Sequence, residues 1–139
     1  MRLITFLNFG GNCEAAFRFY EQHLGGRITM LMRRAEAPDQ TGDTWPGWEQ
    51  SIQYALMEIG ETELMGSDVP PARFKPMRSV YLSLTVDSAR EAERVWGLLS
   101  DGGEIYMPMG ETFFATRFGQ LRDRFGTSWM VMALKPRNP

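Results

Sequence analysis

The predicted elements occur in the same order in both halves of the chain, and this repeat constrains the fold more than any other feature. Each half reads as a strand, a helix that ends at a Gly-Gly pair, and three further strands; the pairs are Gly25-Gly26 and Gly102-Gly103. One such unit is too small to bury its own sheet face, so the two halves are expected to pack together. The order predicts an α+β fold of two β-α-β-β-β modules, although a ferredoxin-like dimeric barrel has a related element count.

The first module is predicted over residues 1–68. A β-rich run at 2–8 ends at Gly10-Gly11, and Asn12 is the candidate N-cap of the helix that follows. The apolar side of this helix recurs at helical spacing, with Ala16, Phe17, Tyr20 and Leu24. Its later strands are predicted at 27–34, 50–59 and 63–68, separated by a loop at 35–48 and a turn at 60–61.

The second module is predicted over residues 79–135, after a proline-containing connector at about 69–78. Its first strand, 79–86, alternates apolar and polar residues, which is typical of a half-buried strand. Asp87 or Ser88 is expected to cap the helix. The remaining strands are predicted at 104–107, 115–123 and 128–134. The whole chain, 1–139, is expected to form a single domain.

Composition excludes several classes of function. The formal net charge of −2 gives no general attraction for nucleic acid. The single cysteine, Cys13, excludes an intramolecular disulfide and a cysteine-based metal cluster, and the single histidine, His23, excludes a multi-histidine centre. The N-terminal apolar run is too short for a signal peptide or a membrane span, so we expect a cytoplasmic protein that binds no membrane.

Four segments carry a resemblance to a known family. They are NFGGNCEAAFRFY at 8–20, LMGSD at 64–68, MPMGETFFATRFG at 107–119 and DRFGTSWM at 123–130. Together they resemble the PhnB-like branch of the vicinal-oxygen-chelate superfamily, which also holds glyoxalase I, bleomycin-resistance proteins and extradiol dioxygenases. The resemblance covers nearly the whole chain. It implies two modules whose curled sheets form a cleft, and usually a homodimer.

The metal-dependent relatives hold their ion with residues of the first and last strands of the modules. Transferred along the matching motifs, three of these positions fall on Thr5, Tyr81 and Met130, and the fourth lies near 65–67. None of the three offers the imidazole or carboxylate that a divalent cation prefers. His23 is expected in the last turn of a helix, where it suits the helix dipole. The sequence therefore predicts no metal and no cofactor.

The polar side of the strand at 79–86 is expected to face the cleft, because its apolar side can cover the helix. It bears Ser79, Tyr81 and Ser83. Tyr81 would either hydrogen-bond a ligand or plug the cavity. We predict Tyr81 and Ser83 as ligand-binding residues, together with Thr5 and Met130.

Arg117 and Asp68 complete the predicted ligand site, and each has a structural alternative. An inward-pointing Arg117 would pair with an anionic ligand, or it would form an ion pair with Asp68, Glu111 or Asp123. Asp68 closes a strand and could instead cap a turn. Cys13, in a first helical turn where a thiol pKa can fall, is either a nucleophile or a small buried residue.

Members of this branch often carry the name of a demethylubiquinone methyltransferase. The chain has no Gly-x-Gly-x-x-Gly pattern and no extended parallel α/β series, so Gly10-Gly11 is better explained as a turn.

Trp45 and Trp48 lie in a loop that could be a lid or an interface. Methionines on or beside predicted strands would fill the core or line a soft apolar pocket: Met30, Met32, Met57, Met65, Met107, Met109, Met130 and Met132.

We therefore predict a metal-independent small-molecule binding protein of the glyoxalase and bleomycin-resistance type, with an apolar or aromatic ligand in the cleft between the modules. One alternative is a lyase, isomerase or transferase with a non-standard site, using Tyr81 with Asp68 or Glu111 as acid–base groups. Another is a structural or regulatory domain whose cleft is filled by its own Met and Phe side chains.

Overall fold

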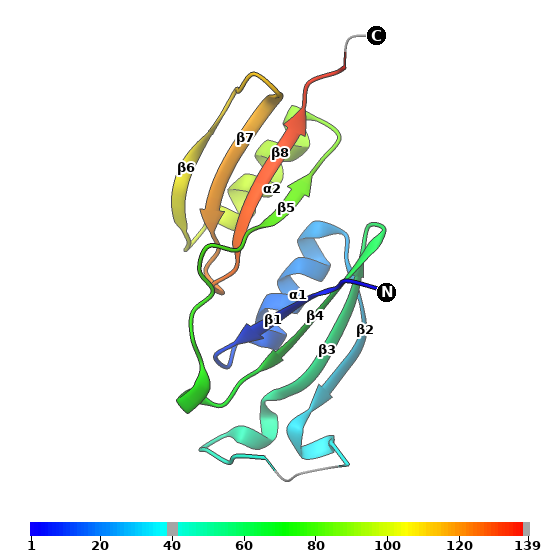
Figure 1. Ribbon diagram of the computed structural model, residues 1–139, viewed down its shortest axis with the longest axis vertical. Helices are drawn as coiled ribbons and strands as arrows, with labels where there is room; N and C mark the ends of the chain where they lie inside the picture. Colours follow the sequence, from blue (N-terminus) through cyan, green and yellow to red (C-terminus); the bar gives the residue numbers. More distant parts are fainter. Residues whose placement is uncertain (39–41, 138–139) are drawn as a thin grey trace. The chain divides into compact units, whose positions relative to one another are not determined.

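The computed structural model describes residues 1–38 and 42–137 and divides the chain into two compact units, Met1–Pro76 and Met77–Pro139 (Figure 1). Each unit contains a four-stranded mixed sheet and one α-helix within the described residues. The α+β fold and the repeated β-α-β-β-β order predicted from the sequence are confirmed.

The first unit begins with β1 (Thr5–Phe9) and α1 (Cys13–Leu24) and continues through three strands. These strands are β2 (Arg27–Arg33), β3 (Ile52–Ile59) and β4 (Thr62–Asp68). The sheet order is β1-β4-β3-β2, with β1 parallel to β4 and the other pairs antiparallel. Gly60, with φ 57°, lies in the tight turn that joins β3 to β4.

The second unit repeats this arrangement with the same connectivity. Its elements are β5 (Leu82–Thr85), α2 (Ala89–Ser100), β6 (Glu104–Gly110), β7 (Ala115–Arg122) and β8 (Ser128–Leu134). The sheet order is β5-β8-β7-β6, with β5 parallel to β8. Strands β5, β6 and β8 therefore start at one end of the sheet, and β7 ends there.

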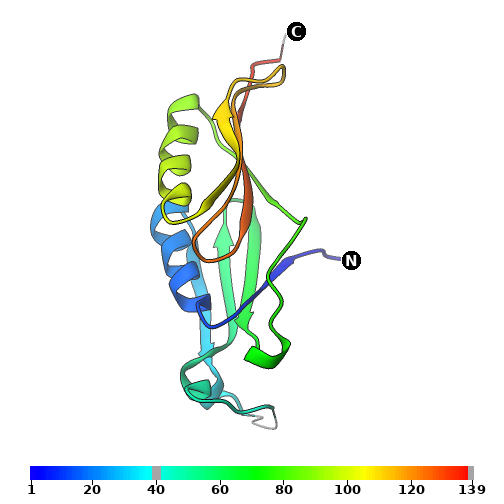
Figure 2. The same cartoon turned by 90° about the vertical axis from the view of Figure 1, so that its left-hand side faces the viewer.

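Each helix packs on one face of its own sheet and forms the core with it (Figure 2). In both units the helix lies so close to its sheet that the strand residue beneath an aromatic side chain of the helix is a glycine. A Cβ on Gly66 would lie 2.8 Å from Phe17 of α1, and a Cβ on Gly119 would lie 2.6 Å from Trp96 of α2. Alternation along the strands then assigns every other residue to the helix-covered face.

Helix starts differ from the sequence prediction in one respect. Ser88 caps α2 as expected, because its Oγ accepts a hydrogen bond from the Glu91 amide at 3.1 Å. Asn12 stands at the cap position of α1, but its side chain makes no capping hydrogen bond. The Asp68 carboxylate instead holds this helix start in place by accepting from the Gly11 and Cys13 amides, at 3.1 and 3.0 Å.

Several strand bounds also differ from the prediction, those of β1, β5 and β6 most, and β1 begins at Thr5 instead of residue 2. The strand predicted at 79–86 is shorter, since β5 begins only at Leu82, and β6 runs on to Gly110 instead of ending at 107. The loop predicted at 35–48 contains two short 3-10 helices, Arg34–Glu36 and Trp48–Gln50, at its edges. Its residues 39–41 lie outside the described residues. Among the residues described, no helix is both long and apolar enough to cross a membrane.

Candidate functional site

The face of the second sheet opposite α2, here called the second open face, carries rows of side chains that run across all four strands. The registers join Ser83 to Met130, Met130 to Gln120, and Gln120 to Met107. Two positions before Ser83 and Met130 in the sequence, a polar row lies at the end where β5 and β8 begin. It consists of Tyr81, Ser128, Arg122 and Glu104.

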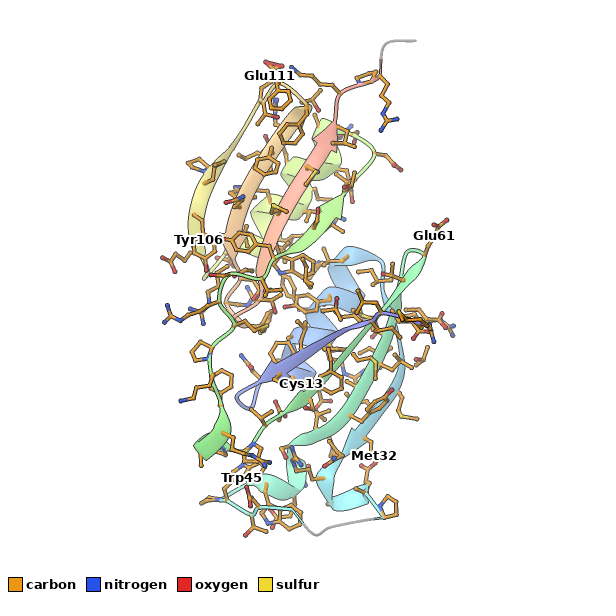
Figure 3. The ribbon with its side chains drawn as sticks, viewed as in Figure 1. Cys13, Met32, Trp45, Glu61, Tyr106 and Glu111 are labelled. Atoms are coloured by element: carbon orange, nitrogen blue, oxygen red, sulfur yellow. The ribbon has the colours of Figure 1, made fainter. Side chains whose placement is uncertain are left out.

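This polar row surrounds a pair of tyrosines. The Tyr81 and Tyr106 rings lie 5.7 Å apart, and the Tyr106 hydroxyl is 3.3 Å from the Oγ of buried Ser128. Figure 3 shows Tyr106 near the start of β6 and Glu111 at the opposite end of that strand. A hollow of about 380 Å³ opens here, lined by Met77, Arg78, Ser79, Tyr81, Glu104, Tyr106 and Arg122.

Arg122 stands out because its charge is unused. Its Nε is buried and has no hydrogen-bond partner, and within the described structure its register partner Glu104 forms no ion pair with it. A buried donor without a partner costs about 1–3 kcal/mol, so native proteins rarely keep one without a reason.

The backbone beside this hollow is strained as well. Ser79 adopts φ 57°, and the described residues include no other non-glycine residue with positive φ. The left-handed region costs an L-residue about 1–2 kcal/mol. Strain of this kind concentrates at functional sites.

The first sheet has a matching open face with different chemistry. One row is apolar across all four strands, through Phe6, Met65, Leu56 and Met30. At the strand-start end, a hollow of about 470 Å³ is bordered by Glu58 and Glu63. Both are paired, with Arg27 2.7 Å from Glu58 and Arg2 2.8 Å from Glu63.

The structure places three predicted ligand residues on one surface. Tyr81, Ser83 and Met130 share the second open face, where Ser83 and Met130 are register partners. Thr5 does not share the equivalent position. It pairs with buried Leu64 on the helix-covered side of β4, and its flanking residue Phe6 occupies the first open face. Thr5 lines the 470 Å³ hollow at the sheet edge.

Arg117 and Asp68 are engaged elsewhere in their own units. The Nε of Arg117 donates to Glu93 of α2 at 2.9 Å, and its register partner is the buried Ala133, so it lies on the helix-covered side of its sheet. Asp68 is 2% exposed, and its second oxygen accepts from the Ile52 amide at 2.8 Å. The geometry of Asp68 is that of a turn cap.

The remaining candidate groups are also tied into the structure. Burial raises the pKa of the Cys13 thiol well above its usual range, and the Asp68 and Glu14 carboxylates raise it further. A neutral, buried thiol is a poor nucleophile, so the helix-start effect on its pKa is overridden. His23 packs on Phe19, with ring centroids 4.5 Å apart. Trp45 lies under the Arg34 guanidinium, 5.3 Å from ring centroid to Cζ.

The residues at the positions of the family's metal ligands do not fit a divalent cation. Thr5 and Tyr81 supply hydroxyls, and Met130 supplies only a thioether, so the donor set lacks imidazole and carboxylate. Across 1–38 and 42–137, no three His, Cys, Asp or Glu side chains come close enough together to hold a metal ion.

Four residues at or beside the hollow were not predicted from the sequence: Arg122, Tyr106, Ser128 and Arg78. Alternation from the predicted strand at 115–123 would have put Phe118, Gln120 and Arg122 on one face. The resemblance instead drew attention to Arg117, which the same alternation puts on the opposite, helix-covered side. Tyr106 lies at an irregularity in β6, between the paired residues Ile105 and Met107, so simple alternation could not assign its face.

Comparison with known proteins identifies the family. Residues 1–132 match the family described as 3-demethylubiquinone-9 3-methyltransferase. The chain belongs to this family. Its structure is similar to protein PA1353 from Pseudomonas aeruginosa, with 38% identity, a TM-score of 0.86 and coverage of 96% of this chain and 97% of that one. It is also similar to the putative 3-demethylubiquinone-9 3-methyltransferase, PhnB protein, from Bacillus cereus, at 29% identity, a TM-score of 0.80 and coverage of 96% and 99%.

More distant likeness places this 3-demethylubiquinone-9 3-methyltransferase family member within a larger fold group. A glyoxylase/bleomycin resistance protein/dioxygenase domain from Frankia sp. EAN1pec matches 97% of this chain and 98% of its own, with a TM-score of 0.66. At 16% identity this shows the fold alone. The PhnB-like resemblance and the glyoxalase/bleomycin-resistance fold, both expected from the sequence, are confirmed.

Proposed function

We propose that this protein binds a small apolar or aromatic molecule without the help of a metal ion, on the second open face. Tyr81, Ser83 and Met130 contact the ligand there. The protein acts in the cytoplasm as a homodimer, the assembly that the family resemblance implies.

The tyrosine-lined hollow is the observation that carries this proposal. It combines two aromatic rings, an unpartnered guanidinium and a methionine-bearing neighbouring row. Ligand sites typically join apolar and aromatic walls with a few well-placed polar groups. Methionine adapts its shape to a flat organic molecule.

The alternative function, acid–base catalysis by Tyr81 with Asp68 or Glu111, is not supported by the surroundings of these two carboxylates. Both Asp68 oxygens accept backbone amide hydrogen bonds, so this carboxylate is not free to take a proton from a substrate. Glu111 pairs with Lys135 at 3.5 Å and lies at the far end of β6 from Tyr106 (Figure 3).

Methyl transfer, which the family name suggests, has no support from the Gly10-Gly11 turn. The Gly11 amide donates to Asp68, and a Cβ on Gly10 would already lie 3.0 Å from the Phe74 ring. The Gly11 amide is therefore already used by Asp68, and Phe74 lies against Gly10, so this turn offers a cofactor phosphate no free amide at Gly11.

A thermal-shift series on chelator-treated protein tests the proposal. Magnesium, manganese, iron(II), nickel and zinc are compared with a panel of aromatic and quinone-like ligands. A ligand that binds only the folded state raises the melting temperature by mass action. We expect stabilisation by an aromatic ligand, reduced in Tyr81→Ala and in Met130→Ala, and no stabilisation by any metal.

Two results would contradict the proposal. One is a clear stabilisation by a single divalent metal that a Tyr81 substitution abolishes, which would restore a metal-dependent enzyme. The other is that no organic ligand of the panel raises the melting temperature, which would favour a structural domain filled by its own Met and Phe side chains. Light scattering at the same concentrations measures the subunit number, and a monomer would remove the homodimer from the proposal.

A further inference from the structure

The geometry points to a specific ligand class for this hollow: an aromatic carboxylate, whose anionic group is held by Arg122 and whose ring lies against Tyr81 and Tyr106. This inference rests on the proposed function and adds the charge and shape of the ligand. It assigns a binding role to Arg122, which no sequence motif marked.

Arg122 is the residue that indicates an anionic group on the ligand. A guanidinium presents its donors in a planar fork that matches the two oxygens of a carboxylate. The Nε of Arg122 is one of those donors, and it is buried without a partner beside the hollow. No ion pair or hydrogen bond engages the rest of this guanidinium among the described residues, so a carboxylate in the hollow would pair with its terminal N–H groups. Arg78, also unpaired among the described residues, adds a second positive charge at the rim.

Tyr81 and Tyr106 indicate an aromatic ring on the ligand. Their ring centroids are 5.7 Å apart with the planes tilted by 42°, and both rings line the hollow with Arg122. The Tyr106 hydroxyl already contacts Ser128 Oγ, which orients that ring. Aromatic side chains prefer edge-to-face or offset contact with a further ring.

The left-handed backbone conformation of Ser79 also contributes to this arrangement. Ser79, with φ 57°, turns the backbone between Arg78 and Tyr81, and all three line the hollow. The conformation places Arg78 and Tyr81 at the same opening instead of continuing β5 toward the connector. A strained residue kept at such a point is consistent with a site that the fold holds ready for a ligand.

The equivalent end of the first sheet supplies an internal contrast. The hollow there is bordered by Glu58 and Glu63, and each of these carboxylates is paired with an arginine. No buried, unpartnered donor borders it among the described residues. The second hollow is lined by one carboxylate, Glu104, and by two arginines, Arg78 and Arg122, so anion binding is expected there and not at the first.

Calorimetric titration of the whole protein with 2-naphthoate and with the neutral 2-naphthamide tests the inference. We expect 2-naphthoate to bind at least about tenfold more tightly than the amide, since a hydrogen bond to a charged group is worth about one to two factors of ten in affinity. Arg122→Gln should raise the Kd for 2-naphthoate by about tenfold and leave the Kd for 2-naphthamide within about twofold.

A matched variant distinguishes the loss of the binding site from the loss of a positive charge elsewhere on the same strand. Arg117→Gln removes the same charge from the same strand, on the side where Arg117 pairs with Glu93, and should leave both affinities unchanged. Should Arg122→Gln fail to fold, the side-chain Nε–H resonance of Arg122 in the unaltered protein replaces it. That resonance should shift on titration with 2-naphthoate and stay in place with the amide.

The outcomes distinguish the two proposals. Equal affinity for acid and amide, unchanged in Arg122→Gln, overturns the carboxylate inference and leaves an aromatic binding protein standing. Binding of inorganic phosphate as tight as that of 2-naphthoate overturns the aromatic half. Failure of both naphthalene probes to bind overturns this inference, and the broader aromatic panel then decides the proposed function on its own.

Discussion

The two repeats share one backbone plan but differ at the end of the sheet where most strands begin. In the first unit that end carries Glu58 and Glu63, each neutralised by an arginine. In the second unit the same row carries Glu104 and Arg122, which form no ion pair with each other among the described residues, beside two tyrosines. The open faces differ likewise, since the first has a continuous apolar row and the second a mixed one. The backbone repeat thus specifies where a site can lie, and the side chains of one row decide which repeat has it.

The repeats also differ in how a helix is started. Ser88 caps α2 from the adjacent residue, within the same short segment of chain. The start of α1 depends on Asp68, which lies 55 residues from Cys13 in the sequence and also binds the Ile52 amide. One carboxylate therefore joins the end of β4, the start of α1 and the start of β3. The stability of the first unit depends on a single long-range group that the second unit lacks at its helix start.

Removing that carboxylate should have the largest effect. Asp68→Ala leaves three buried or half-buried amides without their acceptor, so we expect a loss of about 3–5 kcal/mol from the free energy of unfolding. Urea unfolding followed by circular dichroism measures it. Ser67→Ala is the matched control, because the adjacent Ser67 Oγ makes only one long contact, 3.4 Å from Asn8 Oδ1.

Cys13 gives this prediction a local readout. The thiol is buried at the helix start that Asp68 holds, so a thiol reagent should label it only when this region opens. Labelling should be much faster in Asp68→Ala than in Ser67→Ala. Equal labelling rates and equal stability would show that α1 starts without Asp68.

The glycines under the helix rings test whether both repeats are packed equally tightly. In Gly119→Ala the new Cβ would lie 2.6 Å from Trp96 and 3.2 Å from the Cα of Met109, so we expect a cost of about 1–3 kcal/mol. Gly66→Ala should cost a similar amount, because Phe17 and the Leu7 carbonyl lie equally close. Gly110→Ala, with nothing within 4 Å, is the control in the same sheet. A neutral Gly119→Ala would mean that α2 is loosely seated.

The local cap of α2 should have a smaller effect. Ser88→Ala removes one side-chain acceptor at a helix start and is expected to cost about 1 kcal/mol. Ser88→Asp keeps an acceptor at the same place and should recover most of the loss in the same urea titration. A cost for Ser88→Ala as large as that of Asp68→Ala would remove the contrast between the two helix starts.

The fold could be predicted from the sequence because its signals are local. Alternation in the strand at 79–86, the Gly-Gly pairs and Ser88 each specify nearby structure, and their order along the chain gave the repeat. What holds the start of α1 could not be predicted from Asn12, since the group that binds the Gly11 and Cys13 amides is the distant Asp68 carboxylate. A local cap pattern does not reveal such a long-range partner.

The site was predictable only in part. Tyr81 and Ser83 were predicted from strand alternation and Met130 from the matching motifs, and Ser83 and Met130 are register partners in the structure. Arg117 was assigned by its position in a motif, but alternation from Phe118, Gln120 and Arg122 puts it on the helix-covered side. Arg122 could not be recognised from sequence, because what marks it is the absence of a partner for its buried Nε in the described structure.

The smallest expected effect is on stability at Arg122 itself, and it sharpens the comparison between the two strand-start ends. Arg27→Gln in the first unit breaks an exposed ion pair with Glu58 and should cost at most about 0.5 kcal/mol. Arg122→Gln removes a buried donor that has no partner, so the relief of that penalty should offset the lost packing of the side-chain stem and leave the urea midpoint at or slightly above its original value. A ligand-binding arginine contributes to affinity, and the folded state gains nothing from it until the ligand is present. If Arg122→Gln instead lost more than about 1 kcal/mol without ligand, Arg122 would stabilise the fold more than the paired Arg27 does, and the contrast between a binding arginine and a structural one would be lost.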